Sequence, residues 1–194
     1  MQLYTALLLC VLVLSLTGGL KPFQPIVALG RFQTAFFALS MLALSRFDFS
    51  PNPETRFNLC AVFMPLALAL WARTEAIRGG VPCALAAFSL VAFGAEKAGF
   101  FAGAQSGVLT GFIAGASAAA LADTPKTALA VAAAIPLVCA ILSTCFALVT
   151  GSYVVMDFGQ VALRDAQMSA LCFGSVLLCM YTSAKRKDMP GEQG

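Results

Sequence analysis

The chain has 194 residues, of which 60% are hydrophobic and 11% are charged, with a net charge of +3 and a mean hydropathy of +0.87. Soluble domains carry about 25% charged residues, so the composition predicts one membrane domain over 1–184 and a short basic and polar tail at 185–194. The absence of histidine from the sequence excludes histidine-ligated haem, histidine zinc sites and histidine acid–base catalysis. The small net charge also argues against a nucleic-acid-binding face.

Apolar segments separated by polar or turn-forming residues predict an all-α transmembrane bundle of about seven spans, with six as the alternative. The first segment covers 3–20 and lacks a preceding basic region, so we expect a retained span rather than a cleaved signal sequence. The second covers 26–44 and the third 57–71, with a solvated polar loop at 46–56 between them. Trp71 ends the third segment, where interfacial aromatic residues are common.

The boundary between the fourth and fifth spans can be drawn in two ways. A single helix over 82–121 would be about 60 Å long, roughly twice the thickness of the membrane core. A break at 94–97 places the only two charges of this region in a turn, where they avoid about 2.5–3.5 kcal/mol each at a helix centre. A break at 102–106 is the alternative. We adopt the first, which makes the fifth span 98–122.

The fifth span carries glycines at a strict spacing of four. This spacing places them near one helix face, and the missing side chains let another helix approach closely in lipid. Packing within one monomer and an interface with a second subunit both fit the pattern. We expect the alanine-rich sixth span, 127–150, to be the packing partner. The glycines of this face are Gly99, Gly103, Gly107, Gly111 and Gly115.

A polar stretch precedes the seventh span at 166–183. Its polar residues recur at intervals of three or four, which predicts a helix with one polar face. That face lines a polar cavity or cradles a lipid head group, or else the helix lies on the membrane surface. Asp157 and Asp165 would point about 80° apart on one helix, so we do not expect a catalytic pair. The residues of the candidate polar cavity are Tyr153, Asp157, Gln160, Arg164 and Gln167.

The sequence contains no motif that predicts a cofactor or a metal ligand set. No phosphate-binding loop, serine elbow or metal-ligand cluster is present. The seven cysteines form no CxxC pair and lie in or beside apolar segments, so we interpret them as reduced packing residues.

The distribution of basic residues predicts the orientation in the membrane. Seven spans would put eight of the twelve basic residues on the side of the C-terminus, which the positive-inside rule makes cytoplasmic, or its matrix or stroma equivalent.

We predict a non-enzymatic integral membrane protein, either transporter- or channel-like or an accessory subunit. Its predicted partners are the lipid bilayer and either further copies or a larger membrane complex. The alternative is a membrane-embedded enzyme acting on a lipid or other apolar substrate through 157–164.

Overall fold

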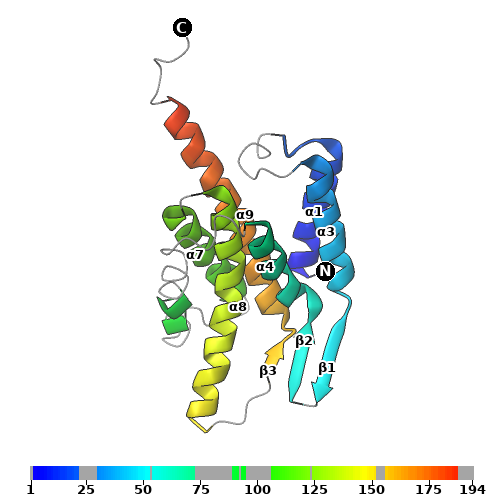
Figure 1. Cartoon of the computed structure of the whole chain (residues 1–194), viewed down its shortest axis with the longest axis vertical. Helices are drawn as coiled ribbons and strands as arrows, with labels where there is room; N and C mark the ends of the chain where they lie inside the picture. The colour runs from blue at the N-terminus through cyan, green and yellow to red at the C-terminus, as the bar shows by residue number, and fades with distance from the viewer. Residues whose placement is uncertain are drawn as a thin grey trace.

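The computed structural model describes residues 2–21, 30–52, 54–72, 89–91, 93–94, 106–122, 124–151 and 156–187. The described residues form a helical bundle with a small three-stranded sheet at one end (Figure 1). The prediction of a mostly helical chain is confirmed, and the sheet is a feature that the sequence analysis missed.

The N-terminal helices form an antiparallel hairpin (Figure 1). Helix α1 (Leu3–Thr17) ends at Gly18, whose φ of 81° is the left-handed conformation that glycine adopts most readily. Helix α3 (Arg31–Leu44) returns alongside it. The buried Ser15 hydroxyl of α1 donates to the Arg31 carbonyl at 2.6 Å, which fixes the start of α3 beside the last turn of α1.

The sheet joins two segments about a hundred residues apart. Strands β1 (Asp48–Asn52) and β2 (Thr55–Asn58) pair antiparallel, and β3 (Met156–Phe158) pairs parallel with β2. The rings of Phe57 and Phe158 lie opposite each other in the register and stack with centroids 5.5 Å apart. The segment 46–56, predicted as a solvated loop, is mostly exposed in its described residues but forms β1 and the start of β2, so only the predicted loop conformation is wrong. The prediction of a helix through 156–158 is wrong, because strand pairing overrides the local pattern.

Helix α4 (Leu59–Trp71) follows β2 directly. The Asn58 side chain accepts from the Cys60 backbone N–H at 3.0 Å and so caps the helix N-terminus. Helix α8 (Pro125–Val149) has an equivalent cap, since the Thr124 hydroxyl accepts from the Thr127 N–H at 3.3 Å. Both helices contain an internal proline, Pro65 in α4 and Pro136 in α8.

The remaining long helices are α7 (Ser106–Leu121) and α9 (Val161–Lys187). Helix α9 begins five residues before the predicted seventh span, and it runs through the centre of the bundle in Figure 1. Among the described residues, α8 and α9 are long and apolar enough to cross a membrane by length and composition. Helices α1, α3, α4 and α7 are apolar but shorter. The predicted fourth span and the break at 94–97 lie mostly outside the described residues.

Two buried clusters divide the bundle by side-chain size. The first joins α1, α3 and α4 through larger side chains, including Leu8, Met41 and Met64. The second joins α7, α8 and α9 and consists mostly of small residues, such as Ala114 and Ala170, around Ile135. Helices α8 and α9 contribute to both clusters and thus link the two halves.

Candidate functional site

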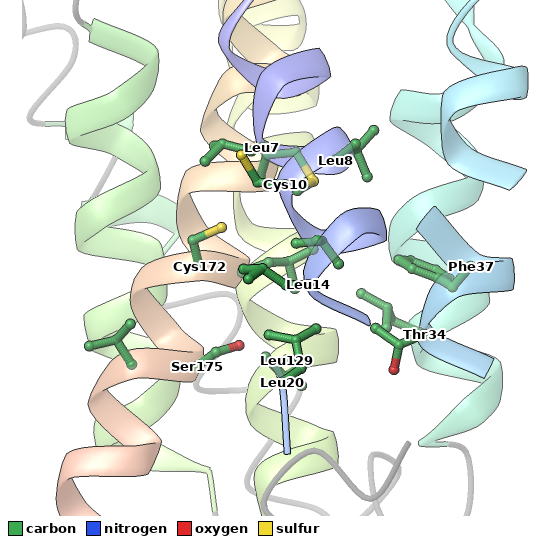
Figure 2. A pocket seen from close by; sticks show the side chains of 15 residues that line it. Leu7, Leu8, Cys10, Leu14, Leu20, Thr34, Phe37, Leu129, Cys172 and Ser175 are labelled. Atoms are coloured by element: carbon green, nitrogen blue, oxygen red, sulfur yellow. The ribbon is translucent and has the colours of Figure 1, made fainter. Parts of the chain in front are cut away.

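A groove separates the N-terminal hairpin from α9 (Figure 2). We call this cavity of about 340 Å³ the α1/α9 groove. Leu7 and Leu14 of α1, Phe37 of α3 and Cys172 of α9 line it, and almost all its other lining side chains are apolar too. Two hydroxyls reach its wall. That of Thr34 donates to the Gly30 carbonyl at 3.2 Å, and the other belongs to Ser175.

A buried arginine lies beyond one end of the groove. Arg164 is 5% exposed, and its Nη1 donates to the Tyr4 hydroxyl at 2.9 Å and to the Ser45 carbonyl at 3.2 Å. Its Nη2 donates to the Gly159 carbonyl at 3.2 Å, and the guanidinium carbon lies 4.4 Å from the centroid of the Tyr4 ring. Within the described part of the chain, its hydrogen bonds all go to neutral oxygens. Arg164 therefore joins α9, α1 and α3.

Arg164 and its neighbour Asp165 act on opposite helix ends, and we call them the helix-end pair. Ser45 is the C-terminal cap of α3, where the helix dipole favours a cation. Asp165 Oδ1 accepts from the Tyr4 backbone N–H at 2.8 Å, in the first turn of α1, where an anion is favoured. The side chain of Gln2, the N-cap residue of α1, makes no capping hydrogen bond itself. The pair thus holds the open end of the hairpin on α9.

Gln167 satisfies backbone carbonyls near the two internal prolines. Proline has no N–H, so Pro65 leaves the carbonyl of Ala61, four residues earlier, without its helical partner. The fully buried Gln167 donates from Nε2 to that carbonyl at 2.8 Å, and to the Ala133 carbonyl of α8 at 3.4 Å. Ala133 lies three residues before Pro136. Such side-chain donors are one way that proline is accommodated in membrane helices.

The structure separates the residues predicted to share a polar face. Asp157 is in β3 and accepts from the Gly159 N–H at 2.9 Å, whereas Gln160 is exposed just before α9. Arg164 and Gln167 are in α9 and buried, and Tyr153 lies outside the described residues. None of the four described residues lines the α1/α9 groove. The single helical face predicted for them is wrong, because β3 and its turn interrupt the helix.

Two buried polar atoms in this region have no hydrogen-bond partner within the described structure, Arg164 Nε and Gln167 Oε1.

Sequence reasoning did not single out Tyr4, Ser45 or Asn58, which help to organise the same end of the bundle. Asn58 donates to the Ser45 carbonyl at 3.0 Å and to Asp48 Oδ1 at 2.7 Å. A sequence signal existed for Asn58 alone, since Asn before an apolar run is a common helix cap.

The described glycines of the predicted packing face meet α9. A Cβ at Gly107 would lie 2.6 Å from the Ala162 carbonyl oxygen, and one at Gly115 would lie 2.5 Å from that of Ala170. A Cβ at Gly111 would overlap the Ala166 carbonyl oxygen and lie 2.7 Å from Ser169 Cβ. The prediction that α8 packs against the glycine face is therefore wrong for these three positions, which contact α9. Gly99 and Gly103 lie outside the described residues.

Helix α9 carries the complement of the glycine series. Its small residues at the contact are also spaced by four, and they are Ala162, Ala166, Ala170 and Gly174. The two helices therefore approach backbone to backbone, with little side-chain volume between them.

The described residues hold no group of three or more His, Cys, Asp or Glu side chains that could bind a metal ion. The six described cysteines are free thiols. The chain matches no protein-family model, no curated protein and no solved structure.

Proposed function

We propose that this chain is a multi-pass integral membrane protein that acts without catalysis, as a lipid-binding accessory subunit of a membrane complex. The observation that carries the proposal is the α1/α9 groove, an apolar cavity between helices that are themselves apolar. A cavity of this size is within the usual range for ligand sites. An acyl chain is the apolar group that a bilayer supplies in excess.

The roles of the polar residues support binding rather than chemistry. The helix-end pair caps α1 and α3, and Gln167 donates to carbonyls of α4 and α8. Each of these side chains thus holds helices together, and each is directed at protein atoms rather than at the groove.

The proposed orientation places the C-terminus on the cytoplasmic side. In Figure 1, the starts of α3 and α8 lie at the end of the bundle away from the sheet. Of the described basic residues, Lys21, Arg31 and Lys126 belong to that end, whereas Arg46, Arg56 and Arg164 belong to the sheet end, where acidic residues accompany them. The described acidic residues Asp48, Glu54, Asp157 and Asp165 belong to the sheet end. A basic end of this kind is favoured on the cytoplasmic side.

Transport of an apolar cargo is the second candidate function. It is favoured by the attachment of the N-terminal hairpin, because the helix-end pair fixes only one end of the hairpin to α9. The groove lies beyond that attachment, toward the other end. In the described part of the hairpin, the hydrogen bonds to α9 lie at the sheet end, so separation of the hairpin from α9 at the groove would release a ligand without breaking them.

The test is to extract the protein in mild detergent and measure its native mass together with every bound lipid and subunit. The proposal predicts one retained lipid per chain and a defined partner. Ser175→Phe should fill the groove and expel the lipid, whereas the matched change Ser183→Phe, at an exposed position on α9 away from the groove, should not.

Lipid retained equally by both variants would overturn the groove assignment. A lone chain that still binds lipid would remove the accessory-subunit role and favour transport. A chemically altered lipid in the extract would favour the alternative of a membrane enzyme acting through 157–164.

A further inference from the structure

The volume of the α1/α9 groove limits what can occupy it. A membrane helix has a diameter of about 10–12 Å, so a fifteen-residue stretch fills roughly 2,000 Å³. The groove holds about 340 Å³. A helix of a partner can therefore pack over the groove but cannot enter it, whereas a single extended hydrocarbon chain can.

The end of the groove away from the sheet is flanked by exposed cations. Lys21 directly follows the groove residue Leu20, and Arg31 lies one turn before the groove residue Thr34. The hydrogen bond from Ser15 to the Arg31 carbonyl holds the start of α3 beside the last turn of α1, which ends four residues before Lys21. Both Lys21 and Arg31 are exposed, and the Arg31 guanidinium carbon lies 5.5 Å from the centroid of the Phe32 ring.

A third cation belongs to the same end of the bundle. Lys126 lies one turn before the groove residue Leu129, and its Nζ is 5.8 Å from the centroid of the Trp71 ring. The acidic residues that the structure describes belong to the sheet end instead. The groove mouth thus combines an apolar slot with positive charge at the level where a lipid head group would lie.

We propose that the α1/α9 groove selects an anionic phospholipid, with one acyl chain in the groove and the phosphate between Lys21 and Arg31. This inference rests on the proposed lipid-binding function and adds the head-group class. The electrostatic attraction between one Lys or Arg and an anionic lipid surface strengthens binding by roughly fivefold. Two cations then predict a preference of about 25-fold over a zwitterionic lipid with the same acyl chains.

The experiment titrates the delipidated full-length protein in detergent with phosphatidylglycerol or phosphatidylcholine of identical acyl chains, and reads the bound fraction by native mass spectrometry. We expect phosphatidylglycerol to bind about 25-fold more tightly at low ionic strength. Lys21→Gln with Arg31→Gln should bring the two affinities within about twofold, and phosphatidylcholine binding should be unchanged. The matched pair Arg46→Gln with Arg56→Gln, two exposed residues at the sheet end, should keep the preference.

Equal affinities for the two lipids in the unmodified protein would overturn the head-group assignment. So would a preference that survives Lys21→Gln with Arg31→Gln. In either case, loss of both lipids in Ser175→Phe would leave the lipid-binding function standing. Lipid binding that Ser175→Phe does not affect, or release of a protein subunit instead of lipid, would overturn the groove assignment itself.

Discussion

Helix α9 meets the rest of the bundle in two different ways. Against α7 it presents alanines and a glycine to glycines, and the backbones touch. Against α1 it presents Met168, Leu171 and Cys172 to leucines, and a cavity of about 340 Å³ remains between them. Small residues allow continuous contact, whereas branched and long side chains hold the backbones apart and leave space where they do not interlock.

The two interfaces also differ in what holds them together. The α7/α9 interface depends on close packing, because the described glycines of α7 lie against the backbone of α9 and the rings of Phe112 and Phe173 meet edge to face with centroids 5.0 Å apart. The α1/α9 interface is fixed at one end by hydrogen bonds and charge, through the helix-end pair. The comparison teaches that one helix can be rigidly packed on one side and leave a ligand-sized groove on the other.

The largest effect should come from adding a methyl group to the α7/α9 interface. Gly111→Ala places its Cβ against the backbone of Ala166 and Ala170, which cannot move aside cheaply. We expect a loss of stability toward the upper end of the roughly 1–3 kcal/mol range for overpacking. The measurement is thermal unfolding in detergent. A fluorogenic dye monitors it by reacting with the thiols of Cys60 and Cys139 as they become exposed.

Gly174→Ala is the matched control on the opposite helix. Its Cβ would lie 3.5 Å from the nearest atom, the Gly115 carbonyl oxygen, which is an ordinary contact distance. Because alanine favours the helix over glycine by about 1 kcal/mol or less, this variant should be neutral or slightly stabilised. A similar loss of stability in Gly111→Ala and Gly174→Ala would show that close backbone contact at Gly111 does not determine the effect of an added Cβ.

A second prediction removes the attachment of the N-terminal hairpin. Arg164→Gln loses charged hydrogen bonds to Tyr4 and Ser45, and such bonds contribute about 1.5–3 kcal/mol. We expect a loss of about 2 kcal/mol by the same assay. Arg56→Gln, at an exposed position in β2, should change stability little, and an equal loss there would argue against a special role for Arg164.

A third prediction concerns the proline-bearing helices. Gln167→Leu should cost about 1 kcal/mol, since interhelical hydrogen bonds in membrane proteins average about 0.6 kcal/mol and reach about 1.7 kcal/mol. Pro65→Ala would restore an N–H for the Ala61 carbonyl, which Gln167 now satisfies. The double variant should therefore lose less than the sum of the two single variants. Strict additivity would mean that Gln167 does not compensate for Pro65.

The smallest effect should come from Asp165→Asn. The amide oxygen can still accept from the Tyr4 N–H, so only the charge at the α1 N-terminus is lost. We expect a loss of about 0.5 kcal/mol at low ionic strength, within the range for charges at helix ends. Asp165 is partly exposed, so salt should reduce the difference. A loss as large as that of Arg164→Gln would show that the two residues do not act as separate caps.

Several features of the fold could be read from the sequence. The apolar runs predicted where α1, α4 and α8 lie. Gly18 ends the first run, the polar segment before Asn58 precedes the second, and Thr124 with Pro125 precedes the third. The spacing of Gly107, Gly111 and Gly115 predicted a face without side chains, because helical geometry alone determines which residues share a face.

What those faces meet was decided only by the tertiary structure. The sequence favoured α8 as the partner of the glycines, but α9 carries alanines at the same spacing, and a small-residue pattern does not identify its complement. Residues 156–158 read as helical, yet they pair with β2 across about a hundred residues. Arg164 looked like part of a polar face, and it lies buried because α1 and α3 bring helix ends to it. Local periodicity fixes directions on one helix, whereas partners depend on contacts between segments that are distant in the chain.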